Sequence, residues 1–227
     1  MTSASVAAAR RVKADRGDQT RERLLTASVN VFGRHGFDGA TTRMLAEAAG
    51  VNQQAIPYHF GSKEGLHIAT ADFIVEQIGT HVGPMRESLN ERFRHAQESG
   101  DPVDATQARA LLTQMIETVA TMFAGETSEP WARFIIREQM EPTEAFQRLY
   151  DGIMGPMFDV AARLLGILLR EDPGSERVRL RTMSLLGSVL VFRVAHAAVL
   201  ARLEWASVGP AQLAIIQAHA RDLVASI

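Results

Sequence analysis

Helical periodicity, interrupted by proline and glycine, is the feature that most constrains how this chain folds. Apolar residues recur every three or four positions over long stretches, and no stretch sustains the alternation typical of a half-buried strand. Pairs such as Gly83-Pro84 and Gly209-Pro210 separate these stretches. The pattern predicts an all-α fold of about nine or ten helices. The longest helices are expected at residues 63–82, 104–124, 143–170 and 175–204.

Charge is distributed unevenly along the chain. Residues 1–66 carry nine Lys and Arg against six Asp and Glu, whereas residues 67–227 carry fifteen against twenty, giving balances of +3 and −5. A basic front end on an acidic body favours a localised contact with nucleic acid, although chance variation also explains a difference of this size. We expect a loose basic arm at residues 1–17, a helix-turn-helix DNA-binding domain at 18–62, and a ligand-binding and dimerisation domain at 63–227.

The sequence lacks the motifs that most enzymes and metal proteins require. It has no cysteine, which excludes disulfides and cysteine-ligated metal sites. Its seven histidines show no metal-ligand spacing, and there is no phosphate-binding loop, dinucleotide-binding motif or nucleophile elbow. We therefore expect no cofactor, no metal and no enzymatic activity.

Two segments bear on where the protein acts. Arg10 and Arg11 directly follow a short run of alanines, so the N-terminus has no apolar region of the kind found in a signal peptide. Residues 183–203 are long and apolar enough to span a bilayer, but Arg193 and His196 lie in their middle. We interpret this segment as a buried helix and expect a cytoplasmic protein without a membrane span.

Residues 41–66 have the pattern of a helix-turn-helix. Two apolar-patterned stretches of about two turns each flank Gly50, where glycine permits a positive φ. Thr41 or Thr42 is placed to cap the first helix, and Asn52 to cap the second, which we expect to run to about Tyr58. Alanines let the two helices approach closely, which is the geometry that presents a second helix to the major groove of DNA.

Polar residues of this segment are candidates for contacts to DNA. Amide side chains donate and accept hydrogen bonds at once, so glutamine and asparagine suit base edges in the major groove. Thr42 and Arg43 stand at a helix start, and Lys63 begins the next helix, where free backbone N–H groups favour phosphate. A solvated polar face on a small helical hairpin is the alternative. The predicted DNA-binding residues are Thr42, Arg43, Asn52, Gln53, Gln54, Tyr58, His59 and Lys63.

This segment resembles the DNA-binding domain of the TetR family of bacterial transcriptional regulators. The family pattern Thr-Arg-x-(Ile/Leu)-Ala-x-x-Ala-Gly-Val is met from Thr42 to Val51, and the ending aromatic-His-Phe-x-Ser-Lys-Glu-x-Leu from Tyr58 to Leu66. The resemblance covers roughly residues 20–66. It implies a dimeric, all-helical regulator whose larger domain senses a ligand.

Two positions depart from the family pattern. Gln54 stands where many relatives have glycine, and Pro57 stands where many have a tyrosine that reaches a phosphate. Proline lacks a backbone N–H and clashes with the carbonyl four residues earlier, here that of Gln53. We therefore expect the recognition helix to end early or bend at Pro57.

A weaker resemblance extends into the larger domain. Residues 131–157 resemble the C-terminal domain of the CecR subgroup of this family, which implies regulation linked to drugs or xenobiotics. Polar residues in these apolar helices either line a ligand cavity or pair internally, and the methionines form either an adaptable wall or plain core. We expect the cavity between the helices at 104–124, 131–140 and 143–170, under a roof at 63–82. The predicted ligand-binding residues are Arg133, Arg137, Gln139, Met115 and Met122.

Small residues form a narrow stripe along the helix expected at residues 175–204. They recur at steps of four and three, which keeps them on one face and lets a second helix approach closely. With the helix at 143–170 they would build a four-helix bundle between two subunits, although the stripe also suits a contact within one subunit. The predicted dimer-interface residues are Ser184, Ser188, Val191, Ala195 and Ala198.

Together these features predict a homodimer that binds a palindromic operator in double-stranded DNA and represses transcription. A small hydrophobic or drug-like effector is expected to release the DNA, by favouring a different state of the protein. The alternatives are a ligand-insensitive architectural DNA-binding protein and an enzyme.

Overall fold

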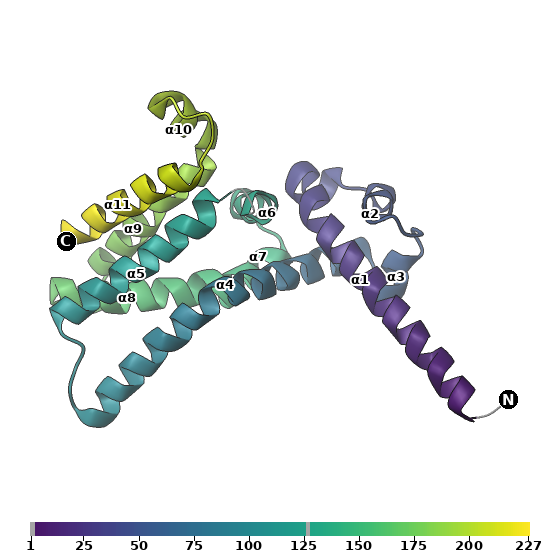
Figure 1. The fold of residues 1–227 in the computed structure, drawn as a ribbon, viewed down its shortest axis with the longest axis horizontal. Helices are drawn as coiled ribbons and strands as arrows, with labels where there is room; N and C mark the ends of the chain where they lie inside the picture. Colours follow the sequence, from purple (N-terminus) through teal and green to yellow (C-terminus); the bar gives the residue numbers. More distant parts are fainter. Residues whose placement is uncertain (1–2, 126–127) are drawn as a thin grey trace. The chain divides into compact units, whose positions relative to one another are not determined.

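Every regular element is a helix in the two ranges that the computed structural model describes, residues 3–125 and 128–227 (Figure 1). The predicted all-α class is therefore confirmed. The helices form two compact units, Met1–Ile74 with Arg133–Leu149, and Val75–Ala132 with Tyr150–Ile227. This division differs from the predicted boundary between residues 62 and 63, because the start of α4 and most of α6 (Glu129–Met140) join the first unit.

The first unit is built on α1 (Ser3–Gly39), α2 (Thr42–Ala49) and α3 (Ala55–Phe60). Because α1 begins at Ser3, the expected loose arm is helical from that residue on, and residues 1–2 lie outside the described ranges. Gly36 interrupts α1 with a positive φ of 72°. Fully buried side chains from the three helices form the core of this unit: Leu24, Phe32, Leu45 and Ile56.

The next helix, α4 (Lys63–Ser99), continues through Gly83-Pro84, where the sequence predicted its end. That prediction was wrong. Pro84 removes only one backbone donor from the helix, whereas Val82, Leu89 and Phe93 are buried on either side of it. Burial of this apolar face outweighs the loss of one helical hydrogen bond.

The second unit is a bundle around α5 (Ala105–Ala124), which contacts α8 (Gly155–Leu169), α9 (Glu176–Val194) and α11 (Pro210–Ala225) (Figure 1). A capping box between Asp104 and Gln107 fixes the start of α5 close to its predicted position. The core between these helices includes Leu112, Ile116, Leu164, Val189 and Ile216.

The long helix predicted to end near residue 170 is divided into α7 (Glu144–Leu149), a π-helical turn (Tyr150–Met154) and α8. Pro156 has no N–H to donate to the carbonyl of Gly152. A Cβ on Gly152 would lie 2.6 Å from Val75 Cγ1, so the backbone of the π-helical turn lies close to the Val75 side chain of α4. The wider π turn accommodates both features.

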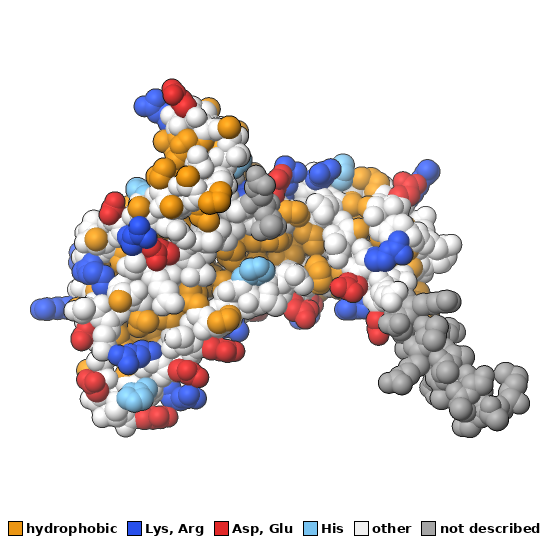
Figure 2. All heavy atoms as spheres, in the orientation of Figure 1, with side chains coloured by type: hydrophobic (Ala, Val, Ile, Leu, Met, Phe, Trp, Pro, Cys, Tyr) orange, Lys and Arg blue, Asp and Glu red, His pale blue; other side chains and the backbone are white. Residues whose placement is uncertain are grey.

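The helix predicted at residues 175–204 breaks at Ala195 into α9 and α10 (His196–Leu203), which are bent by 79°. Arg193, on the last turn of α9, donates hydrogen bonds to groups at and after the end of α5: the carbonyls of Phe123 and Gly125, and Ser128 Oγ. These bonds fix α9 just before the bend. No residue of α10 is buried, and Figure 2 shows hydrophobic side chains gathered on this helix.

Two segments in the described ranges are long and apolar enough to cross a membrane: Glu144–Leu169, and α9 with α10 if the bent pair counts as one span. The bent pair contains most of residues 183–203, the segment singled out in the sequence. Core helices of helical proteins meet the same criterion, and both segments contribute residues to the core of the second unit. The criterion therefore does not distinguish a membrane span from a core helix here.

Candidate DNA-binding surface

Short-range contacts hold the turn between α2 and α3. Thr41 caps α2 by accepting a hydrogen bond from Met44 N at 3.2 Å, and Gly50 ends α2 in the left-handed conformation with a φ of 62°. Both features agree with the sequence prediction. Gln53 Nε2 donates to Thr42 Oγ1 at 2.6 Å, so this amide joins the turn before α3 to the start of α2.

The exposed residues of α3 and of the turn before it form one surface, called here the recognition surface: Asn52, Gln53, Gln54, Pro57 and Tyr58. Ile56 is completely buried on the other side and anchors α3 to the core. The Tyr58 side chain is 80% exposed, and its ring meets that of half-buried His59 edge-on, with centroids 4.8 Å apart. A large aromatic side chain left this exposed is suited to contact another molecule.

The amide of Asn52 organises the turn rather than the helix itself. Asn52 Oδ1 accepts a hydrogen bond from Gln54 N at 2.9 Å, whereas α3 begins only at Ala55, without a side-chain cap. The predicted cap is therefore displaced by two residues. The side chain of Gln54 stays exposed beside it.

Pro57 neither shortens nor bends the recognition helix, which corrects the expectation from sequence. α3 starts at Ala55, so Pro57 lies in the first turn, where backbone N–H groups have no partner within the helix. The Gln53 carbonyl accepts a hydrogen bond from Ile56 N at 3.2 Å, and α3 continues to Phe60. Proline is well tolerated at such a position.

Arg43 keeps an exposed guanidinium at the start of α2. Its Nε lies 2.7 Å from Glu47 Oε1, and this hydrogen bond raises the pKa of Arg43. Both side chains are largely exposed. Because an exposed ion pair is weak and exchanges readily, Arg43 stays a candidate for a phosphate contact.

Lys63 has a different environment, which favours a structural role over the predicted phosphate contact. Its half-buried Nζ donates to the carbonyls of Phe37 and Ala40 at 3.0 and 3.2 Å, and lies 4.2 Å from the centre of the Phe37 ring. The ammonium group thus ties the start of α4 to the end of α1 instead of facing solvent. Its partners precede it by more than twenty residues, which no local pattern reveals.

Two further arginines, neither of them predicted to contact DNA, brace the same unit or join it to α6. Arg23 Nη2 donates to the Gly50 carbonyl at 2.9 Å and so supports the turn before α3. Arg137, which the sequence assigned to the ligand, lies over Gly36: a Cβ there would be 2.8 Å from Arg137 Nη1. Arg137 Nη2 also lies 3.4 Å from the Arg34 carbonyl, to which it donates.

A buried histidine, His67 of α4, lies at the centre of the first unit. Its ring centroid is 4.5 to 5.1 Å from those of three phenylalanines on α1 and α6. The three rings are Phe32, Phe37 and Phe134. This aromatic cluster packs α1, α4 and α6 against one another, and each such pair adds to the stability gained from burial alone.

A buried carboxylate faces the histidine. Glu138 Oε1 lies 3.4 Å from His67 Nε2, and Glu138 Oε2 accepts hydrogen bonds from Thr143 N and Thr143 Oγ1 at 3.1 and 2.8 Å. Burial, and to a lesser extent the Lys63 ammonium, lower the pKa of His67 to about 4. The imidazole is therefore neutral near pH 7.

The predicted ligand-binding residues do not come together. Arg133 and Gln139 are exposed on α6, and Arg137 packs on α1. Met122 is half-buried on α5, whereas Met115 of the same helix is buried and lines a cavity. Of the five, only Met115 lines the cavity described next: α6 from residue 133 onward packs into the first unit, and Met122 of α5 is outside the lining.

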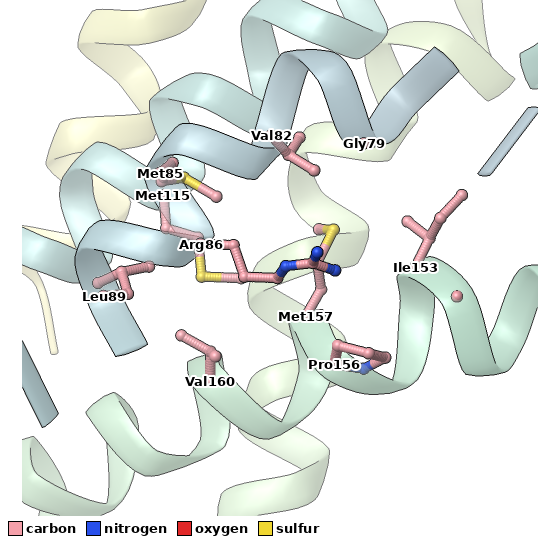
Figure 3. A pocket seen from close by; sticks show the side chains of 11 residues that line it. Gly79, Val82, Met85, Arg86, Leu89, Met115, Ile153, Pro156, Met157 and Val160 are labelled. Carbon is pink, nitrogen blue, oxygen red and sulfur yellow. The ribbon is translucent and has the colours of Figure 1, made fainter. Parts of the chain in front are cut away.

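An apolar slot lies within the second unit, between α4, α5 and the segment that contains α8 (Figure 3). Its free volume is about 20 Å³, enough for about one water molecule. Residues of α5 and α8 line it, as the sequence predicted, and its α4 side overlaps the end of the expected roof at Gly79 and Val82 and extends beyond it to Leu89. The lining residues are Gly79, Val82, Met85, Arg86, Leu89, Met115, Gly152, Ile153, Pro156, Met157 and Val160.

The predicted dimer stripe lies on an exposed face of α9, except at its far end. Ser184 and Val191 are exposed and Ser188 is half-buried, but the bend at Ala195 takes Ala198 off the line of the others. Larger apolar residues recur on the same face and are 44 to 62% exposed. We call this face the α9 stripe: Leu180, Met183, Ser184, Gly187, Val191 and Val194.

No cluster of three or more His, Asp or Glu side chains suited to hold a metal occurs in the part of the chain that the structure describes. The features that remain are an exposed recognition surface on the second helix of a helix-turn-helix, a helical bundle with a narrow apolar slot, and an exposed apolar stripe. They define the class of helix-turn-helix DNA-binding regulators.

Comparison with known proteins identifies the family. The model of the bacterial regulatory proteins of the tetR family matches residues 24–70, and that of the C-terminal domain of the HTH-type transcriptional dual regulator CecR matches residues 108–227. CecR of Shigella flexneri is 31% identical over 190 residues, which cover 84% of this chain and 82% of that protein. The repressor AcnR of Corynebacterium glutamicum is 42% identical over 104 residues, covering 46% and 54%.

Solved structures agree on the fold. The transcriptional regulator FadR of Bacillus subtilis, crystallised with stearoyl-CoA, superposes with a TM-score of 0.60 at 18% identity and covers 90% of this chain and 97% of its own. The chain therefore belongs to the TetR family of transcriptional regulators, with a C-terminal domain of the CecR type. Regulators of this family bind DNA and a ligand and act as dimers.

Proposed function

We propose that this chain is a dimeric transcriptional repressor that leaves a palindromic operator when a small apolar effector binds in its second unit. The observation that carries the proposal is the recognition surface. Gln54 and Tyr58 are exposed on it, while Ile56 holds the helix rigidly from below. Rigid presentation of an amide and an aromatic side chain suits contacts to base edges and the sugar-phosphate backbone.

The α9 stripe supports the part of the proposal that concerns a palindromic operator. Its apolar side chains are exposed in the single chain and recur at helical spacing, so two copies can bury them against each other around a two-fold axis. Two recognition helices related by such an axis fit two inverted half-sites. The stripe stays a prediction of the interface, with α8 as the expected second member of a four-helix bundle.

Two helices connect effector binding to DNA binding. α4 and α6 each run from one compact unit into the other. In the first unit α6 contributes Phe134, Arg137 and Glu138, which contact α1 or α4. An effector that moves either helix would shift the recognition surface, with a typical coupling of about 1–3 kcal/mol. Because such a protein acts on the chromosome, we expect it in the cytoplasm.

A DNA-binding assay on the chain's own upstream region tests the proposal. Fluorescence anisotropy would compare that duplex with a scrambled duplex, each with and without a panel of hydrophobic antibiotics. A repressor prefers its own sequence and is released by at least one compound. Equal affinity for both duplexes, with no effect of any compound, would instead support an architectural DNA-binding protein. Chemical turnover of a compound, followed by mass spectrometry, would support an enzyme.

A further inference from the structure

The apolar slot is built from two facing helical surfaces. Gly79, Val82 and Leu89 lie on one face of α4, and Ile153, together with Val160 of α8, lies across from them (Figure 3). Met115 of α5 closes one side. Gly79 has no side chain and a Cβ there would meet nothing within 4 Å, which is why the two surfaces do not fill the space between them.

The slot is able to widen. Three of its lining residues are methionines, whose three flexible bonds let them change shape at low cost. Pro84, one residue before the first of them, removes a helical hydrogen bond and gives α4 a natural place to bend. A volume for one water molecule in the empty protein is therefore compatible with a larger guest. The three methionines are Met85, Met115 and Met157.

One charged group stands in this apolar lining. Arg86 is the single charged side chain among the lining residues, and Figure 3 shows its guanidinium between α4 and α8, beside Met157. Within the described ranges no ion pair or side-chain hydrogen bond engages Arg86, unlike Arg193 or Arg221, each of which has its partner in the same unit. Its five N–H donors are therefore available to an anion.

We infer that the slot takes an apolar molecule with a single anionic end, such as a carboxylate or sulfonate, and that Arg86 selects that end. The apolar body would lie between α4 and α8, displacing the methionine side chains. The anionic group would lie at the mouth, where it gains a charge-assisted contact without full loss of solvent. This inference rests on the proposed function, because it treats the slot as the effector site.

The test uses a matched pair of fluorescent probes on the full-length protein. Anilinonaphthalene sulfonate is apolar and anionic, and N-phenylnaphthylamine is its uncharged counterpart. Both are titrated against the original chain and against Arg86→Met, which keeps an unbranched apolar stem and removes the guanidinium and its charge. We expect Arg86→Met to weaken binding of the sulfonate about tenfold and to leave the uncharged probe unchanged. Arg92→Met, an exposed arginine of α4 outside the slot, is the control.

A second pair of variants locates the probe. Gly79→Leu adds a side chain at the slot, where its Cβ would meet nothing within 4 Å, and should abolish binding of both probes. Gly83→Leu, one turn further along α4 with equally open surroundings but outside the lining, should have no effect. Any one of three results overturns the inference. The sulfonate does not bind the original chain, Arg86→Met weakens both probes equally, or Gly79→Leu binds the probes as well as the original chain does.

Operator binding measured on the same samples separates this inference from the proposed function. One result is that the sulfonate binds in the slot, Arg86→Met weakens this binding, and the sulfonate leaves operator affinity unchanged. The ligand class of the slot then stands, and its role as the effector site is wrong. If DNA is released by an uncharged compound, and Arg86→Met has no effect on any anion, the proposed function stands and the inference fails.

Discussion

The two units of this chain differ in how particular polar and apolar side chains are engaged. In the first unit, groups that could face other molecules are engaged internally: Lys63 with two carbonyls, His67 with a carboxylate and three rings, and Arg137 with the turn at Gly36. In the second unit, Arg86 has no such engagement, and the apolar residues of the α9 stripe face solvent.

This difference indicates which parts of the molecule are complete in a single chain. Buried polar side chains have hydrogen-bond partners in both units over the described residues, and the first unit leaves one well-supported surface for DNA. The second unit leaves an apolar face and a lined slot open, as expected of a region whose stability and function depend on further molecules. Variants can test each half of this comparison separately.

The largest effect is expected in the second unit from Val191→Arg in the α9 stripe. If two copies bury this stripe, an unpaired arginine there prevents dimerisation and lowers operator affinity by about two to three orders of magnitude. Ala214→Arg, on an exposed position of α11, is the control. Sedimentation and anisotropy at micromolar protein give the result, and a dimer of Val191→Arg with normal operator affinity contradicts the stripe as the interface.

The next effect is a pH dependence of the first unit's stability. His67 has a folded pKa of about 4, below its usual 6.5, so the unfolded chain takes up the proton first as pH falls. The free energy of unfolding should therefore decrease between about pH 6.5 and pH 4, by up to about 3 kcal/mol. Above pH 6.5 this contribution is constant. Urea denaturation at a series of pH values measures it.

A matched pair of variants isolates this histidine. His67→Gln should remove the decrease in the free energy of unfolding between about pH 6.5 and pH 4. His95 is an exposed histidine of α4, and His95→Gln should retain this decrease. An unchanged pH profile in His67→Gln would assign the dependence to other groups.

A smaller effect separates two neighbouring amides of the recognition surface. Gln54→Ala should relax base preference by about 1–3 kcal/mol, as expected for a bidentate contact. Gln53 instead donates to Thr42 and braces the turn, so Gln53→Ala should weaken binding to all duplexes about equally. Anisotropy with the operator and with single-base variants of it distinguishes the two. Identical sequence preferences in Gln54→Ala and the original chain would rule out base contact.

The smallest effects are expected at Arg43 and Lys63, the two basic residues that the sequence predicted to contact DNA phosphates. Arg43→Ala should reduce the slope of log affinity against log salt by about one charge, with little change in stability. Lys63→Met should leave that slope unchanged and lower the free energy of unfolding by about 1–2 kcal/mol, because two carbonyls lose their charged donor. A reduced salt slope in Lys63→Met would restore its role at the DNA backbone.

The sequence predicted those features whose causes are local. Thr41 and Gly50 mark the two ends of α2 through contacts within a few residues, and Gly50 takes the positive φ that glycine allows. Prediction failed where distant contacts decide. Burial along α4 overrides Pro84, and Arg193 reaches α5 just before the break at Ala195.

The same limit applies to the candidate sites. The recognition surface could be predicted because its residues follow one another within a short segment. The partner of Arg137 precedes it by about a hundred positions, so its side chain was assigned to a ligand when it contacts α1. Arg86 gave no signal in the sequence, since only the packing of α4 against α8 places it in an apolar lining.

The contact between Gly36 and Arg137 has a consequence for genetics. Any other residue at position 36 must adopt an unfavourable φ and displace the guanidinium that lies 2.8 Å from its Cβ position. Changes at either position therefore break the same contact, although neither residue belongs to the recognition surface or to the slot. In a mutant screen for strains that no longer respond to an inducer, we expect alleles at these two positions to share one phenotype and, when combined, to add little to each other.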